Sequence, residues 1–124
     1  MSTYEVAVSA AFSARHAAAT PGGQLERPHR HRWRIEAAFR SDGLTEEGFV
    51  VDFLAVRGAL EQLAAELAGA DLNLVVPGPG GASAERLAQF LADRLADRLH
   101  RPVHRLTVTE APGCRAMYYP AGPA

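Results

Sequence analysis

The sequence has a single cysteine, no lysine and no long apolar run. Cys114 has no partner for an intrachain disulfide, and no basic segment followed by an apolar stretch marks a secretory signal, so we expect a cytoplasmic protein. The apolar runs are far shorter than the roughly 20 residues that a helix needs to cross a bilayer. We therefore expect no membrane-spanning helix.

An excess of charge of one sign is missing as well. The 13 basic residues are all arginine and are balanced by 14 acidic residues, which leaves a formal net charge of −1. Proteins that bind nucleic acid or membrane surfaces electrostatically carry a clear basic excess, so neither is an expected partner. A small molecule is the expected partner, and a chain of 124 residues predicts a single domain over residues 1–124.

Two strands are predicted in the first third of the chain, where apolar residues alternate with others. Residues 3–13 have an apolar side chain at every second position, which is the period of a strand with one buried face. Residues 14–28 contain prolines and glycines and predict a loop or a pair of turns. Residues 29–40 alternate between histidine or apolar residues and arginine or glutamate, so the histidines of this segment share one face.

The rest of the chain predicts an α+β fold with the order ββααββ. Asp52 and Ser83 are the expected N-caps of two helices whose apolar residues recur at steps of three and four. The linker between these helices, residues 68–82, ends in a run of prolines and glycines that cannot lie inside a helix. The remaining elements are two helices and two short strands, predicted over about residues 52–66, 83–99, 103–110 and 114–119.

Three histidines form the clearest candidate site. His29 and His31 occupy positions i and i+2 of a strand, so their imidazoles project from one face, and His16 lies just past the first strand. If the two strands pair as a hairpin, one nitrogen of each ring can bind the same zinc ion at the ~2.0–2.1 Å length of a zinc–nitrogen bond. Three histidines with an open fourth position are typical of catalytic zinc, although such sites also accept iron, nickel or cobalt. The alternative is that these are ordinary core or surface histidines.

Further motifs occur in a characteristic order along the whole chain. They are FSARH at residues 12–16, HRH at 29–31, GFVVDF at 48–53, Leu72–Asn73, SAE at 83–85 and VTE at 108–110. This ordered set resembles the 6-pyruvoyltetrahydropterin synthase and 6-carboxytetrahydropterin synthase family, whose motifs are FxAxH, HGH, GMVxDF, Leu-Asn, TxE and a late strand glutamate. The resemblance covers essentially the whole chain.

The resemblance implies a T-fold, a four-stranded antiparallel sheet with two helices on one face. It also implies a homo-oligomer, a hexamer or tetramer in which the sheets join into a barrel with active sites at subunit boundaries. Zn²⁺ would be held by the three histidines. Glu110 would bind the nitrogen-rich edge of a pterin through two parallel hydrogen bonds, and Glu85 would contribute to substrate binding.

The sequence also departs from the family pattern. Leu25 stands where the family has its catalytic cysteine, and Ala68–Gly69 stand where it has an Asp-His pair. Glu26 resembles the glutamate of a subgroup with the pattern ExxHxH, and it is our candidate acid or base. Asp71 is a candidate replacement for the missing aspartate. Arg30 replaces the glycine of HGH and is a candidate substrate contact.

Each candidate has a simpler alternative. Glu26 can be a solvated loop carboxylate, Glu85 a helix-capping residue and Glu110 the partner of a nearby arginine. Asp52 is expected to cap a helix rather than to catalyse, and Cys114 is expected to be a buried free thiol. His100 and His104 are expected to be structural, near the end of the second helix.

Three functional hypotheses follow from these residues. The first is a zinc-dependent lyase or cyclase acting on a non-standard substrate of specialised metabolism, by carbon–carbon cleavage, aldol-type closure or elimination. The second is an enzyme that uses Glu26 to form 6-hydroxymethyldihydropterin from dihydroneopterin triphosphate. The third is a non-catalytic scaffold that binds zinc or a pterin without turnover.

Overall fold

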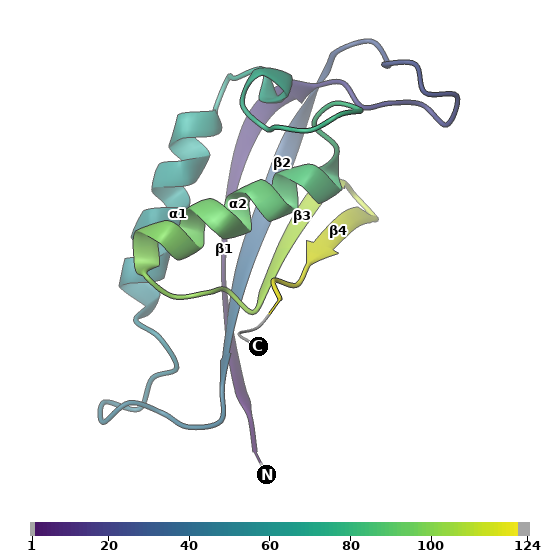
Figure 1. The fold of residues 1–124 in the computed structure, drawn as a ribbon. Helices are drawn as coiled ribbons and strands as arrows, with labels where there is room; N and C mark the ends of the chain where they lie inside the picture. Colours follow the sequence, from purple (N-terminus) through teal and green to yellow (C-terminus); the bar gives the residue numbers. More distant parts are fainter. Residues whose placement is uncertain (1, 122–124) are drawn as a thin grey trace.

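The computed structural model describes residues 2–121 and has the predicted α+β architecture (Figure 1). Its elements, in chain order, are β1 (Tyr4–His16), β2 (His29–Ser41), α1 (Phe53–Leu67), the short 3-10 helix η1 (Leu72–Leu74), α2 (Ala84–Leu99), β3 (Arg105–Ala111) and β4 (Cys114–Tyr118). The order ββααββ is confirmed. The 3-10 turn was not predicted and lies within the expected linker.

The four strands form one antiparallel sheet in the order β1-β2-β3-β4. β1 and β2 pair over their full lengths, from Tyr4 opposite Ser41 to His16 opposite His29. β1 therefore continues three residues beyond the predicted end at residue 13. The reason is that inward-facing Ala14 and His16 keep the alternation of the strand, although neither residue has the large apolar side chain that indicates a strand in a sequence.

Both helices cover the same face of this sheet (Figure 1). The buried stripe of α1 consists of Val56, Leu60, Leu63, Ala64 and Leu67, and that of α2 consists of Leu87, Ala88, Leu91, Ala92 and Leu95. These side chains pack with the inward-facing residues of the strands into one core, and burial of apolar area is the main stabilising term. Among residues 2–121, neither helix has the length and hydropathy needed to cross a bilayer.

The predicted N-caps of both helices are present. The Asp52 carboxylate accepts a hydrogen bond from the Leu54 amide at 2.9 Å, and the Ser83 hydroxyl accepts one from the Arg86 amide at 3.1 Å. Each bond satisfies one of the amides that a helix start leaves without a partner. These caps fix where α1 and α2 begin on the sheet.

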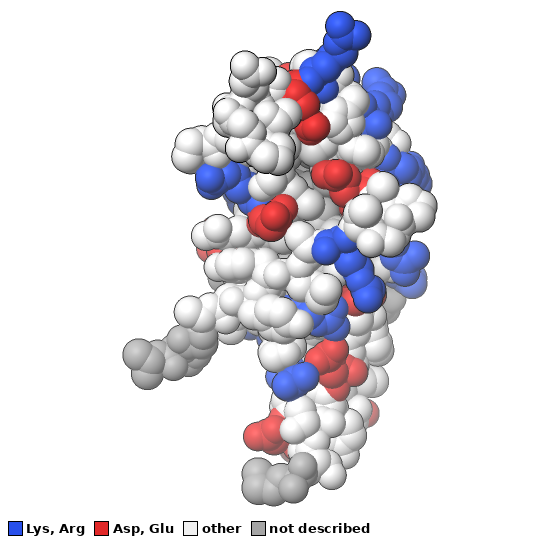
Figure 2. Space-filling model, turned by 90° about the vertical axis from the view of Figure 1, so that its right-hand side faces the viewer, with Lys and Arg blue, Asp and Glu red and all other residues white. Residues whose placement is uncertain are grey.

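The opposite face of the sheet is polar and carries charges of both signs. Near the start of β1, Glu5 bonds to Arg40 at 3.1 Å and to Arg105 at 2.8 Å. Arg105 also contacts Glu36 at 3.2 Å. Figure 2 shows arginine and acidic side chains interspersed over the side of the molecule that carries β4, in keeping with the balanced composition.

Candidate metal centre

The three predicted ligands meet at one end of the β1–β2 hairpin. His16 is the last residue of β1 and lies directly opposite His29, the first residue of β2, while His31 follows two positions along the same face. One ring nitrogen from each histidine lies within 4.8 Å of those of the other two. The strand register thus brings together residues that are 13 and 15 positions apart in the chain.

Backbone carbonyls fix the orientation of two of the three rings. His16 Nδ1 donates to the carbonyl of Ala82 at 2.7 Å, and His29 Nδ1 donates to the carbonyl of Arg27 at 3.0 Å. Because a carbonyl only accepts, Nδ1 is the donor in both rings, so in the neutral form of each ring Nε2 has the free lone pair. Ligand histidines in metal sites are held by the same kind of second hydrogen bond.

The free nitrogens point at one another. The Nε2 atoms of His16 and His29 are 3.0 Å apart, close to the roughly 3.3 Å that separates two nitrogens in a tetrahedral zinc site with bonds of ~2.05 Å. His31 Nε2 is buried and has no hydrogen-bond partner within residues 2–121. Facing lone pairs and a buried nitrogen without a partner are unfavourable unless a proton or a cation lies between them.

Burial favours the metal-binding form of His31. It lowers the pKa of this ring, and the Glu110 carboxylate opposes the shift; the lowered pKa favours the neutral form that a metal ligand needs. Trp33 closes the inner side of the cluster, with its ring centroid 4.8 Å from that of His16 and 5.3 Å from that of His31. The residues therefore fit a divalent cation with three imidazole ligands.

Glu110 lies at the edge of the histidine cluster. Its carboxylate oxygens are 3.6 Å from His16 Nε2 and 3.8 Å from His31 Nε2. No arginine of residues 2–121 pairs with it, so the alternative of a pair with a nearby arginine has no support. Glu110 and Glu85 also line one open hollow of about 500 Å³, together with residues 113–117. The two predicted substrate-binding glutamates therefore share one cavity, and Glu110 connects this cavity to the histidines.

Glu26 lies beside His29, the third histidine of the cluster. Its Oε1 is 3.8 Å from His29 Nε2 and accepts a hydrogen bond from the Ala18 amide at 3.1 Å. The backbone amide of Glu26 donates to the carbonyl of Ala18 at 2.9 Å. The carboxylate is thus held in place beside the ligands, which a freely solvated loop carboxylate would not be.

Asp71 and Arg30 have less direct relations to the cluster. The Asp71 carboxylate accepts the amide of Asn73 at 3.0 Å and so caps the 3-10 turn. Arg30 lies between His29 and His31 on β2, so its side chain leaves the opposite face of that strand. It lines a separate hollow together with residues of β1 and α1.

One expectation and one alternative about local structure were wrong. Cys114 is exposed rather than buried, because it begins the edge strand β4 directly after a turn, on the rim of the hollow. Glu85 does not close a capping box, because Arg86 occupies the third helical position and the Ser83 amide donates instead to Gly81 at 3.1 Å.

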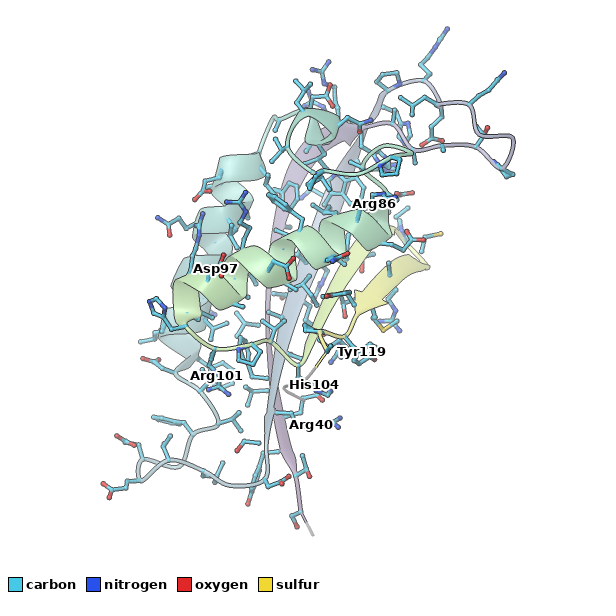
Figure 3. The ribbon with its side chains drawn as sticks, viewed as in Figure 1. Arg40, Arg86, Asp97, Arg101, His104 and Tyr119 are labelled. Atoms are coloured by element: carbon cyan, nitrogen blue, oxygen red, sulfur yellow. The ribbon has the colours of Figure 1, made fainter. Side chains whose placement is uncertain are left out.

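The two remaining histidines lie away from the cluster. His100 adopts a left-handed conformation with a φ of 55° and is the C-cap of α2. Figure 3 shows His104 beside Tyr119 and near Arg40, toward the start of β1. Its ring centroid is 5.8 Å from that of Tyr119. Neither histidine belongs to the candidate site.

Sequence reasoning missed one residue of the site, Asn73. Its side-chain amide is hydrogen-bonded to Ala17, which follows His16, and to Ala82, whose carbonyl holds the His16 ring. The only signal was its place in the Leu-Asn motif. That motif does not show which residues the amide contacts.

A four-stranded antiparallel sheet with two helices on one face, and a three-histidine cluster at the end of its first hairpin, define a T-fold protein with a candidate metal centre. The model of the 6-pyruvoyl tetrahydropterin synthase family matches residues 5–121, and the chain belongs to this family of pterin-related lyases. The predicted family and fold are thereby confirmed.

Solved structures of distant relatives have the same fold. The 6-pyruvoyltetrahydropterin synthase of Plasmodium vivax has a TM-score of 0.78 at 16% identity, and that of Plasmodium falciparum has 0.77 at 18%; both comparisons cover 97% of this chain and 99% of the other. The Caenorhabditis elegans synthase has a TM-score of 0.80 at 15% identity over 98% of both chains. No curated protein sequence gives a significant match.

Proposed function

We propose that the chain is a zinc-dependent lyase or cyclase whose ligands are His16, His29 and His31. The observation that carries this proposal is the convergence of three histidine rings. Two of them have Nδ1 bound to a carbonyl, and the Nε2 of the third is buried without a hydrogen-bond partner among residues 2–121. When bound, zinc supplies Lewis-acid polarisation of a substrate hydroxyl or carbonyl oxygen. Carbon–carbon cleavage, aldol-type closure and elimination all use this polarisation.

The substrate is proposed to occupy the hollow that Glu85 and Glu110 line. A carboxylate accepts two parallel N–H bonds from the edge of a pterin, and the position of Glu110 between this hollow and the histidines suits an anchor that orients the substrate toward the metal. Arg30 leaves the opposite face of β2 and reaches such a substrate only from a neighbouring subunit. The substrate class is a pterin or another carbonyl compound.

Glu26 is the proposed acid or base, because its carboxylate is held 3.8 Å from His29 Nε2. Two solved structures of the P. vivax enzyme are variants in which a glutamate described as a catalytic residue is replaced by alanine or cysteine. By analogy, Glu26 supports the version of the proposal in which dihydroneopterin triphosphate gives 6-hydroxymethyldihydropterin. Asp71 serves as a second proton-transfer group only if its carboxylate releases the amide of Asn73.

The absence of the family's usual catalytic groups favours a second candidate function. Leu25 has no titratable group, and Ala68–Gly69 offer no acid or base. A protein that binds zinc and a pterin without turnover needs neither. The two candidates differ in the need for Glu26, because only an enzyme requires a carboxylate at that position.

The decisive experiment incubates the zinc-loaded protein with dihydroneopterin triphosphate and analyses the products. We expect turnover by the wild type, a loss of about 100-fold or more for Glu26→Gln and no loss for Glu46→Gln, a control at an exposed loop glutamate. If neither the wild type nor Glu26→Cys converts the compound, the pterin-lyase version fails. Pterin binding without turnover supports the scaffold.

Metal content tests the site independently of the substrate. The wild type, purified without chelator, should contain one zinc per subunit. His31→Ala removes one of three ligands and should lower the zinc affinity by more than the roughly 100-fold that the loss of an outer hydrogen bond costs. Unchanged metal content in this variant contradicts the proposed ligand set.

The sheet edges support a homo-oligomer, a hexamer or tetramer with a barrel of joined sheets. β1 and β4 are the edge strands of the sheet. The outer edge of β1 is bonded to Gly69 and Ala70 at its end, through Ser13 and Arg15, and open sheet edges pair readily with other chains. Exposed Phe53 and Leu54 lie beside β1 in a shallow hollow. Native mass spectrometry tests the assembly, which we place in the cytoplasm, and a monomer at micromolar concentration contradicts it.

A further inference from the structure

The side-chain amide of Asn73 connects the two segments that hold His16. Its Oδ1 accepts the Ala17 amide at 3.0 Å and the Ala82 amide at 3.3 Å, and its Nδ2 donates to the Ala17 carbonyl at 2.9 Å. Both polar groups of the Ala17 backbone are thus paired with one side chain. Ala17 lies between Arg15 and Ala18, which form isolated bridges to Asp71 and Gly81, so the Asn73 amide adds to the contacts between these two segments.

Both segments bear directly on His16. Ala17 is the next residue in the chain, and the carbonyl of Ala82 accepts the proton of His16 Nδ1 at 2.7 Å. The His16 ring is almost completely buried, with 1% of its surface exposed. Its Nε2 therefore points at the other two histidines only as long as Ala17 and Ala82 keep their places.

We propose that Asn73 is a positioning residue for the metal centre. It holds Ala17 and Ala82, and these two residues in turn orient the His16 ring. The inference rests on the proposed function in so far as the site binds a metal. The segment before Ala82 is rich in glycine and proline, so it has little regular structure of its own to fix the Ala82 carbonyl. A backbone hydrogen bond from the Ala19 amide to the Gly80 carbonyl, at 2.9 Å, holds this segment beside the chain that follows β1. The bond from the Ala82 amide to Asn73 adds an anchor at the residue whose carbonyl holds the His16 ring.

The chemistry of the amide explains why asparagine suits this position. Asparagine carries an acceptor and a donor on one short side chain, which matches the N–H and C=O of Ala17 together. Aspartate keeps the acceptor but sets a second acceptor against the Ala17 carbonyl. Alanine removes both groups and leaves partly buried backbone atoms of Ala17 and Ala82 without partners.

The test measures metal affinity in Asn73→Ala and Asn73→Asp by competition with a chelator, with Zn²⁺ and with Co²⁺ as a spectroscopic probe. We expect the alanine variant to bind 10- to 100-fold more weakly, as outer-shell substitutions typically do (about 10–100-fold), with weakened visible absorption of the cobalt form. The aspartate variant should fall between alanine and the wild type. Gln62→Ala is the matched control, because it removes an amide that contacts Arg98 away from the site, and it should leave the affinity unchanged.

A purely structural role would give a different result. In that case Asn73→Ala lowers the unfolding temperature but leaves the metal affinity and the cobalt spectrum unchanged, which overturns the proposal. If the alanine variant does not fold, the aspartate variant decides by the same criteria.

A readout without metal separates this inference from the proposed function. In ¹⁵N-labelled apoprotein, His16 should be a single Nδ1–H tautomer in the wild type and a mixture of tautomers in Asn73→Asp. Failure of the wild type to bind any metal overturns the proposed function. An unchanged His16 tautomer in the variant overturns the positioning role instead.

Discussion

A methyl group added at Gly81 should be far more damaging than one added at Gly80. Both glycines have a φ near +80°, where an L side chain is strained, so each substitution to alanine costs about 1–2 kcal/mol in backbone energy. At Gly80 the new Cβ meets only the Ala19 Cβ, at 3.7 Å, which is an ordinary contact. Gly80→Ala should therefore lose about 1–2 kcal/mol and nothing more.

Gly81→Ala carries two further costs. Its Cβ would overlap the carbonyl oxygen of Ala17 and lie 3.1 Å from the carbonyl carbon, and forcing such a contact costs about 1–3 kcal/mol. Moving that carbonyl also breaks its hydrogen bond from Asn73, which is worth about 1 kcal/mol. The total is about 3–6 kcal/mol, at least about 2 more than at Gly80.

Thermal and urea unfolding of the apoprotein, followed by circular dichroism, measures this difference. At about 4 °C per kcal/mol for a domain of this size, Gly81→Ala should melt at least about 8 °C below Gly80→Ala. The apo form is required because metal binding would add its own stabilisation. Equal melting temperatures for the two variants would refute the close approach of Gly81 to Ala17.

Substitutions at three further positions test the rest of the fold. Trp33→Phe removes a fully buried indole whose N–H is hydrogen-bonded, and should lower the unfolding free energy in urea by about 1–3 kcal/mol; no change would show that this bond contributes nothing. The hydrogen bond from Arg105 lowers the pKa of Glu5, so the carboxylate stabilises the fold above the normal glutamate pKa and this contribution is lost as the pH falls through the lowered value. Glu5→Gln should therefore cost about 1 kcal/mol at pH 7 and nothing near pH 2, and a constant difference across pH would contradict the ion pair. Asp52→Ala should cost about 1 kcal/mol in urea unfolding, whereas Asp52→Asn, which keeps a capping oxygen, should cost almost nothing.

The sequence predicted the fold where local chemistry decides it. The alternation of β1 and β2, the caps at Asp52 and Ser83 and the shared face of His29 and His31 all follow from side-chain periods and backbone hydrogen bonds. These signals depend on residues a few positions apart, so they can be recognised in the sequence without knowledge of the tertiary structure.

The parts that escaped prediction depend on contacts between distant segments. The exposure of Cys114 depends on β4 being the edge of the sheet. The role of Asn73 depends on three chain segments that meet only in the folded protein. A sequence motif marks such residues as notable but does not give their partners.

The single tryptophan gives the protein an intrinsic optical probe. Trp33 packs edge-on against His16 and His31, and no other indole contributes to the emission. Its fluorescence should therefore change when the neighbouring imidazoles bind a metal cation in place of a proton. Titrations can be followed in unlabelled material at concentrations far below those that absorption spectroscopy requires.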